Sequence, residues 1–184
     1  MPRSFRHLIK LEKTDTVVIL GKRGIGKTTL ARALIQYNPQ LSYTIIDIIG
    51  NYKDFKNKYE VLRISPVEKS KLDFALIRAM DKGKFVVMDE IDRFQYDHIL
   101  SYFVNIGRNY GSGWIAIARR PANLSKDFIT NATYTFIAKT TQMRDVEFIR
   151  ASYDIDADDL ASLNEHEFFV FHHDDLIKKI KIEI

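Results

Sequence analysis

The chain has no cysteine among its 184 residues, which excludes disulfides and thiolate metal sites and makes a cytosolic protein the simpler expectation. Glycine and proline are scarce, with 8 and 4 residues, and no linker interrupts the chain. The longest apolar runs have about five residues, far fewer than a membrane span requires. We expect a soluble, intracellular protein with a single domain over residues 1–184, in which the core takes about 15–150 and helices and a hairpin take 151–184.

Charge of one sign is not in large excess either. The net charge is +4, and this mildly basic sum permits a nucleic-acid partner without requiring one, because a solvated lysine-rich surface gives the same value. Hydrophobic residues make up 46% and charged residues 28% of the chain. This balance indicates a folded globular protein rather than a disordered one, and the length suffices to bury a sizeable core.

Short apolar runs alternate with segments of helical periodicity along the first 150 or so residues. Buried strands are expected at 16–20, 43–49, 61–64, 85–88, 114–118 and 134–138, and helices at 27–36, 71–80, 96–106, 143–152 and 158–163. This order predicts an α/β fold with a mostly parallel sheet flanked by helices on both faces. Two alternating strands at 167–171 and 177–184, joined by a polar turn at 172–175, predict a C-terminal β-hairpin added at one edge.

A glycine-rich loop follows the first expected strand and precedes the first expected helix. It matches the pattern G-x-x-x-x-G-K-[ST] at every fixed position, with Gly21, Lys22, Arg23, Gly24, Ile25, Gly26, Lys27 and Thr28. In such a loop the backbone amides and the helix N-terminus surround phosphate oxygens, the lysine reaches the β- and γ-phosphates, and the threonine hydroxyl binds Mg²⁺. We therefore predict that the loop binds ATP or GTP with Mg²⁺, with Lys27 also acting in catalysis and Thr28 as a metal ligand. Thr29 joins the nucleotide-binding candidates, although packing or helix capping accounts for it equally well.

The strand expected at 85–88 ends in two acids, Asp89 and Glu90. Beside a phosphate loop this pattern is typical of a Walker B segment, in which Asp89 holds the Mg²⁺ shell and Glu90 polarises the attacking water. A lone Asp in this place is common to many P-loop proteins, including kinases. The added glutamate points to NTP hydrolysis by the additional-strand (ASCE) class of P-loop NTPases. Asp92 is expected to cap a helix or to lie on the surface.

Two arginine-containing turns follow the acidic pair. Gly107, Arg108, Asn109, Tyr110 and Gly111 lie between an expected helix and an expected strand, and that strand ends in Ala118, Arg119, Arg120 and Pro121. Asn123, Leu124, Phe128, Ile129, Asn131 and Ala132 then lead to the strand at 134–138. This order resembles the FtsK–HerA superfamily of DNA-pumping ATPases, which includes the genome-packaging ATPases of double-stranded DNA viruses. The resemblance covers roughly residues 15–182.

The resemblance implies roles for the arginines. Arg108 lies where the family carries an arginine finger that reaches the nucleotide of the neighbouring subunit, and Asn109 follows where the family often has His. Arg119 lies at the sensor position, which is often a neutral polar residue, so it is either a sensor, a second cationic contact to phosphate or a residue of a subunit interface. Both arginines are catalytic candidates, since a guanidinium near the γ-phosphate can raise the hydrolysis rate by about 10³–10⁵.

Three functions compete at this point. The resemblance favours ATP hydrolysis coupled to translocation of double-stranded DNA, with a homo-oligomeric ring, a capsid or portal protein as a further partner, and a location in the host cytoplasm or virion if the protein is viral. A small-molecule kinase is the first alternative, because the phosphate loop alone suits one. A nucleotide-gated assembly switch that barely hydrolyses is the second.

Other signals are weaker. The acids Asp154, Asp156 and Asp158 suit a helix start better than a calcium loop, and the turn at 172–175 suits a hairpin better than a metal site. His98 and His166 are isolated along the chain and receive no role.

Overall fold

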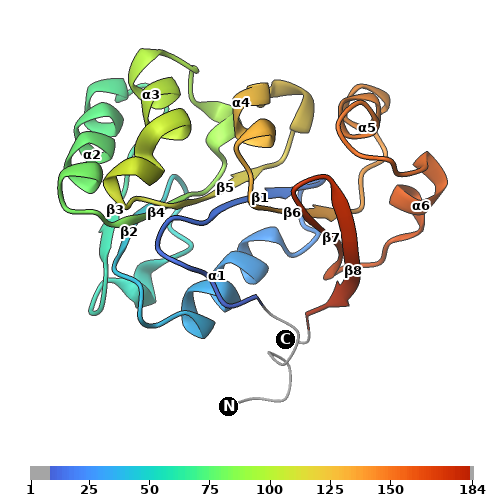
Figure 1. Ribbon diagram of the computed structural model, residues 1–184, viewed down its shortest axis with the longest axis horizontal. Helices are drawn as coiled ribbons and strands as arrows, with labels where there is room; N and C mark the ends of the chain where they lie inside the picture. Colours follow the sequence, from blue (N-terminus) through green and yellow to red (C-terminus); the bar gives the residue numbers. More distant parts are fainter. Residues whose placement is uncertain (1–8, 183–184) are drawn as a thin grey trace.

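The computed structural model describes residues 9–182, so the first eight and last two residues of the expected domain and hairpin lie outside the described part. Its centre is an eight-stranded sheet with the order β3-β2-β4-β5-β1-β6-β7-β8 (Figure 1). The strands are β1 Thr16–Leu20, β2 Tyr43–Ile46, β3 Glu60–Leu62, β4 Phe85–Met88, β5 Trp114–Ala118, β6 Tyr134–Ala138, β7 Glu167–His172 and β8 Asp175–Lys181. The first six are parallel, and β7 and β8 form the antiparallel hairpin. The predicted α/β class and C-terminal hairpin are therefore confirmed.

One strand separates the strand before the phosphate loop from the strand before the acids. Strand β5 pairs with β1 on one side and with β4 on the other. This inserted strand is the mark of the additional-strand class that the acidic pair predicted. The loop and the acids are therefore one strand apart, and the residues that follow β5 lie between them.

Helices cover both faces of the sheet (Figure 1). They are α1 Lys27–Tyr37, α2 Lys69–Asp81, α3 His98–Ile106, α4 Lys126–Thr130, α5 Met143–Arg150 and α6 Ala157–Ser162, with short 3₁₀ turns at η2 Lys53–Phe55, η3 Ile91–Arg93, η4 Gly107–Tyr110 and η5 Pro121–Asn123. Helix α1 and η2 pack on one face, while α2 to α6 pack on the other. Within residues 9–182 none of these helices has the length and apolar character needed to cross a membrane.

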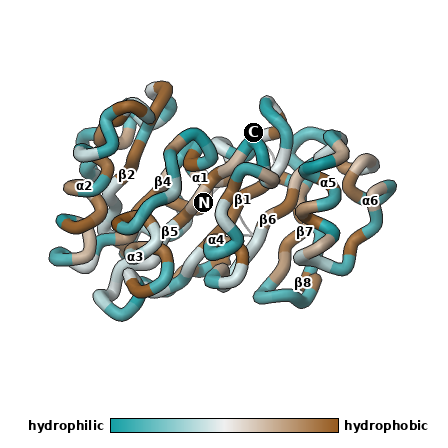
Figure 2. Tube along the Cα trace, turned by 90° about the horizontal axis from the view of Figure 1, so that it is seen from above, coloured by the Kyte–Doolittle hydropathy of each residue, from teal (hydrophilic) through white to brown (hydrophobic). Residues whose placement is uncertain are grey.

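The central strands are buried on both faces, which explains their unbroken apolar runs. In β1, Val17 and Ile19 pack toward α1, whereas Val18 and Leu20 pack toward the opposite helical layer. All four side chains have 0% exposure. The strands β2 and β6 are hydrophobic along most of their length, while the loops at the periphery are hydrophilic (Figure 2).

Several expected boundaries differ from the observed ones by one to three residues, and hydrogen bonds explain the differences at β2 and α3. Strand β2 ends at Ile46 rather than at residue 49, because the Asp47 carboxylate accepts the amides of Gly50, Asn51 and Tyr52 at 2.8, 3.0 and 3.1 Å. Helix α3 begins at His98 rather than at residue 96, because Asp97 caps it by accepting two amides. The short α4 was not predicted from the sequence.

The topology brings the candidate residues to one edge. Parallel strands end at a common edge, and the registers place Leu20 beside Ala118 and Ile137 there. Because β7 runs the other way, its first residues meet the end of β6, with Phe168 opposite Ala138. The phosphate loop, the acids after β4, the arginines after β5 and the residues before β7 therefore all lie at the carboxyl edge.

Candidate functional site

A cavity of about 300 Å³ opens at this edge. Its wall is formed by the phosphate loop and by residues from four other segments, namely Arg23, Gly24, Gly26, Lys27, Thr28, Thr29, Ile49, Asp89, Glu90, Arg119 and His166. The structure thus brings together the loop, both acids and one of the two candidate arginines. Ile49 lies in the turn that follows the end of β2.

The loop backbone depends on glycine at two close approaches. Gly21 has φ +143°, and a Cβ there would lie 2.8 Å from the Cβ of Ala138 on the neighbouring strand. Gly26 has φ +101°, and a Cβ there would lie 2.2 Å from the imidazole Cδ2 of His166. Both positions need a left-handed or otherwise glycine-only backbone as well as free space. Helix α1 then begins at Lys27, so its N-terminal amides face the cavity.

Lys27 is held inside the site. Its side chain is 7% exposed, and its Nζ donates to the carbonyl of Lys22 at 2.7 Å. Burial lowers the pKa of Lys27 from 10.5 to about 8, while the charges of Asp89, Asp92 and Glu90 oppose that shift. At pH 8 this buried amine is about half protonated. An anionic ligand such as a triphosphate therefore strongly favours its charged ammonium form.

This lowered pKa predicts proton uptake on nucleotide binding. The phosphates favour the ammonium, so MgATP binding raises the pKa of Lys27 from about 8. At about pH 9 the free protein holds little of this proton, and binding should take up close to one proton per nucleotide, whereas uptake at Lys27 should be small at about pH 7. Calorimetry in two buffers of different ionisation enthalpy measures the uptake. Equal values at both pH values contradict the prediction, and Lys27→Arg, which stays charged, is the matched control.

Thr28 and Asp89 form a pair of oxygen ligands suited to Mg²⁺. The Thr28 hydroxyl donates to Asp89 Oδ2 at 3.1 Å. Adjacent ligands of an octahedral Mg²⁺ lie roughly 3.0 Å apart when each bond is about 2.1 Å, so this spacing fits the ion. Burial raises the pKa of Asp89, although hydrogen bonds from Thr28 and Asn51 counteract this. A bound cation favours the ionised carboxylate, and the remaining ligands would be waters and phosphate oxygens.

Glu90 is held in an unusual backbone conformation beside Asp89. Its φ is 54°, a left-handed value that non-glycine residues adopt rarely. Its carboxylate lies 2.8 Å from the guanidinium of Arg93 and 3.9 Å from that of Arg119, and 12% of its side chain is exposed. Such strain costs about 1–3 kcal/mol and clusters at functional sites. Glu90 lines the cavity together with Thr28 and Asp89.

Arg119 extends from the end of β5 between the acids. Its amide donates to Asp92 Oδ1 at 3.1 Å, and its Nε lies 3.7 Å from Asp92 Oδ2. The Asp92 side chain is only 2% exposed, so the expectation of a helix cap or a surface charge was wrong. Asp92 instead anchors Arg119, through a contact between η3 and the end of β5 that the sequence does not reveal. Arg120 points elsewhere and pairs with Asp145 at 2.9 Å.

Arg108 does not lie at the cavity. It belongs to η4, which precedes β5, and the following Gly113 donates its amide to Lys13, ahead of β1. Its charge also acts on Asp15, where it counteracts the rise that burial causes in the pKa of that carboxyl. Arg108 therefore lies at the amino edge of the parallel strands, opposite the phosphate loop. It cannot reach the nucleotide site of its own chain.

His166 is a wall residue that the sequence gave no reason to select. Its ring lies against Gly26, and its amide donates to the carbonyl of Ile25 at 3.1 Å. The contact depends on the antiparallel pairing of β7 with β6, which is a long-range feature. No local motif could have signalled it.

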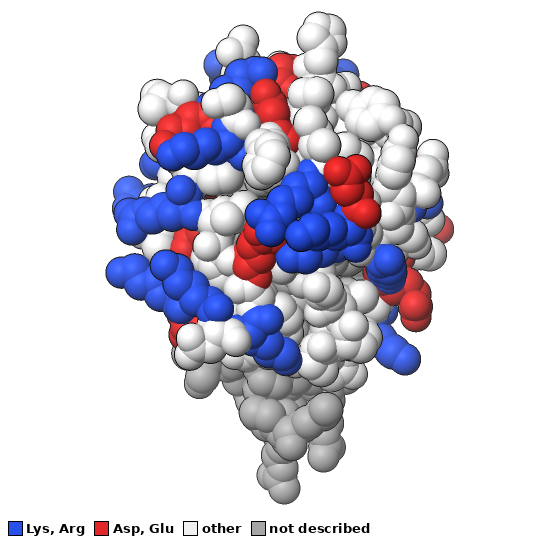
Figure 3. All heavy atoms as spheres, turned by 90° about the vertical axis from the view of Figure 1, so that its left-hand side faces the viewer, with Lys and Arg blue, Asp and Glu red and all other residues white. Residues whose placement is uncertain are grey.

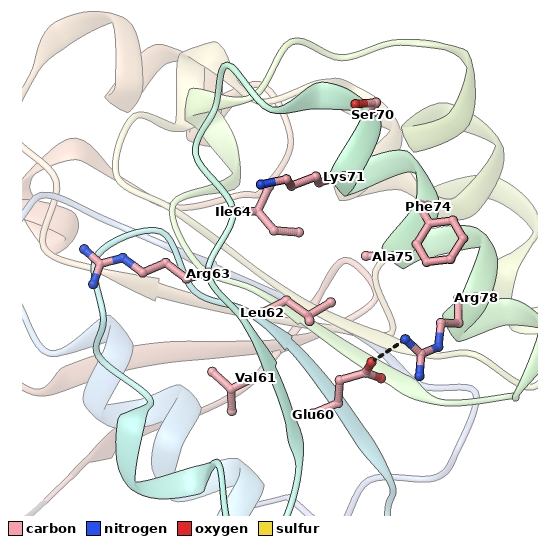
Figure 4. A pocket seen from close by; sticks show the side chains of 10 residues that line it. All are labelled: Glu60, Val61, Leu62, Arg63, Ile64, Ser70, Lys71, Phe74, Ala75 and Arg78. Atoms are coloured by element: carbon pink, nitrogen blue, oxygen red, sulfur yellow. Dashed lines mark ion pairs between the residues drawn. The ribbon is translucent and has the colours of Figure 1, made fainter.

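A larger cavity of about 390 Å³ lies between β3 and α2 and shares no lining residue with this site. Figure 4 shows its apolar lining, with Leu62, Ile64 and Phe74, and the ion pair of Glu60 with Arg78 at 3.1 Å. Lysine and arginine side chains crowd this side of the molecule (Figure 3). The cavity contains neither a phosphate loop nor paired acids facing its interior, so size alone does not identify the nucleotide site.

Solved structures share this architecture. The genome packaging NTPase B204 from Sulfolobus turreted icosahedral virus 2, in complex with AMPPCP, matches with a TM-score of 0.75 and 18% identity over 94% of this chain and 100% of that chain. The fold is that of a P-loop ATPase. VirB4 of Thermoanaerobacter pseudethanolicus matches this P-loop ATPase fold with a TM-score of 0.71 and 12% identity over 92% of this chain and 89% of that chain. The cytoplasmic domain of the type VII secretion ATPase EccC from Thermomonospora curvata matches with 0.68 and 14% over 93% and 25%.

Sequence comparisons match a smaller part of the chain than the structural comparisons do. The family model described as Novel STAND NTPase 3 matches residues 3–65, about a third of the chain, which includes the phosphate loop. No curated protein sequence matches the chain. The predicted resemblance to viral packaging ATPases is therefore confirmed at the level of the fold.

Proposed function

We propose that this protein binds MgATP at the carboxyl-edge cavity and hydrolyses it to move double-stranded DNA, as one subunit of a homo-oligomeric ring of the viral genome-packaging type. The observation that carries the proposal is the convergence of Lys27, Asp89 and Glu90 on one cavity. The architecture around that cavity is shared with B204 over that protein's whole length. A capsid or portal protein is a further partner in this proposal.

The residues divide the chemistry among them. The loop amides and Lys27 hold the β- and γ-phosphates, and Thr28 and Asp89 would hold a Mg²⁺ ion that would spread the charge of these phosphates. Glu90 orients and deprotonates the attacking water, and Arg119 stabilises the charge that develops on the γ-phosphoryl oxygens. A kinase would have no need of the Glu90 carboxylate, which supports hydrolysis over transfer to a small molecule.

Translocation is tested by displacement of a third DNA strand. A triplex-forming oligonucleotide bound to the end of a duplex is removed when a motor passes, and we expect removal that needs ATP and a free duplex end. Glu90→Gln should bind the DNA and leave the triplex in place. ATP hydrolysis that leaves the triplex intact in the unaltered protein would falsify translocation while retaining the ATPase.

Arg108 supports the ring, because it lies at the edge of the strands remote from its own cavity and is exposed. We expect Arg108→Ala to lower hydrolysis by about 10³-fold with little change in MgATP affinity. Mixing Arg108→Ala with Glu90→Gln should restore part of the activity, because an interface between them pairs an intact cavity with an intact finger. Each variant alone stays inactive. Failure of the mixture to recover activity contradicts action across subunits, and Arg150→Ala, another exposed arginine, is the control.

A further inference from the structure

His166 lies in the wall of the cavity, and the phosphate, magnesium and water chemistry does not use it. We propose that His166 forms the nucleoside subsite, with its imidazole contacting the base and ribose of the bound nucleotide. The proposal rests on nucleotide binding at the phosphate loop. It assigns a position to the base and ribose, which the phosphate-loop and acidic motifs do not place.

The imidazole packs directly on the loop backbone. A Cβ built on Gly26 would lie 2.2 Å from His166 Cδ2, 2.9 Å from Nε2 and 3.1 Å from Cγ, so the ring edge lies close against the Cα of Gly26. Gly26 immediately precedes Lys27 and the first turn of α1. A ligand held by the loop amides is therefore within reach of this ring, and the half-buried imidazole lines the same cavity as Thr29.

The backbone of His166 is fixed on both sides. Its amide donates to Ile25 O at 3.1 Å, and its carbonyl accepts the amide of Ile182 at 2.9 Å. Its φ is 62°, in the left-handed region that non-glycine residues rarely adopt. Backbone strain of this kind persists only where the surrounding structure enforces it. The hydrogen bonds on both sides of His166 therefore fix its position against the phosphate loop.

The strand order says which half of the nucleotide the ring meets. Glu90 and Arg119 follow β4 and β5, which lie on one side of β1. The γ-phosphate must lie near them, because hydrolysis occurs there. His166 precedes β7, on the other side of β1 beyond β6. A triphosphate laid along the loop with its γ-phosphate toward Glu90 therefore directs its nucleoside toward His166.

The chemistry of the ring suits that neighbour. A flat imidazole stacks on a purine, and its N–H groups donate to ribose hydroxyls. Among the described residues no carboxylate forms an ion pair with His166. Its polar atoms are therefore not committed to a charged partner in the protein.

The test compares a ligand that has a nucleoside with one that lacks it. Calorimetry measures the Mg²⁺ complexes of ADP and of inorganic tripolyphosphate against His166→Asn and His166→Gly, two residues that tolerate the left-handed backbone. We expect the Kd for ADP to rise about 3–10-fold and that for tripolyphosphate to stay within about twofold. His173→Asn is the matched control, because His173 also has a left-handed φ, 52°, but lies exposed in the hairpin turn.

Equal losses of affinity for both ligands would overturn the proposal, since His166 would then act only through the phosphate loop. An unchanged Kd for ADP would overturn it as well. If the unaltered protein binds neither ligand, nucleotide binding itself fails and takes this proposal with it. Photolabelling of the unaltered protein with 8-azido-ADP needs no variant. The label should map to residues 164–168, and a label confined to 89–93 or 119–121 would contradict the assignment.

Discussion

Glu90→Gln is expected to lower kcat for ATP hydrolysis by about 10²–10⁴-fold and to leave the Kd for MgATP within about threefold. The amide keeps the size of the side chain but cannot accept the proton of the attacking water. Because the phosphate loop and the Thr28–Asp89 pair are untouched, ground-state binding survives.

Single-turnover kinetics together with calorimetry separate these two quantities. Glu147→Gln is the matched control, since Glu147 is an exposed carboxylate on α5. A Glu90→Gln variant that hydrolyses ATP at the unaltered rate removes the residue from the chemistry. A variant that loses MgATP binding equally assigns Glu90 to ligand binding instead.

Lys27→Met is expected to weaken MgATP binding by at least about 10²-fold while stabilising the free protein. Burial lowers the pKa of Lys27 from 10.5 to about 8, so keeping the ammonium charged at neutral pH costs the fold on the order of 3 kcal/mol. That cost is fully present below about pH 8 and is relieved as the pH rises toward 10.5. Methionine fills the space without charge but loses the hydrogen bond to Lys22, which offsets about 1 kcal/mol.

Thermal unfolding of the nucleotide-free protein measures this effect. A net gain of about 1–2 kcal/mol raises Tm by roughly 2–6 °C for a chain of this size. Lys82→Met, at an exposed lysine, should leave both Tm and MgATP affinity nearly unchanged. The claim is that burial of the charged Lys27 destabilises the free protein and that the bound nucleotide compensates for this cost. A lower Tm for Lys27→Met, or retained MgATP affinity, contradicts that claim.

The strands and the phosphate loop could be predicted from the sequence because their signals are local. The runs at β1, β4, β5 and β6 were located to the residue, since central parallel strands buried on both faces leave unbroken apolar runs. Glycine spacing marks the loop because backbone conformation and close packing restrict those positions to glycine. The Asp89–Glu90 pair was visible because it ends an apolar strand.

What the sequence could not supply depends on contacts between distant segments. Asp92 contacts Arg119 across 27 positions of the chain, and that contact exists only because η3 packs on the end of β5. His166 reaches Gly26 only through the pairing of β7 with β6. The end of β2 was overextended because apolar residues continue past Ile46, and the competing hydrogen bonds to Asp47 decide the boundary.

The measurement that tests the central claim most directly is phosphate release from ATP over a series of protein concentrations, with and without double-stranded DNA, beside Glu90→Gln. A ring motor predicts that the turnover rate per subunit rises with both protein concentration and DNA and that the variant is inactive throughout. A turnover rate that ignores both, or an absence of turnover in the unaltered protein, contradicts the motor and leaves only the phosphate-loop site to be explained.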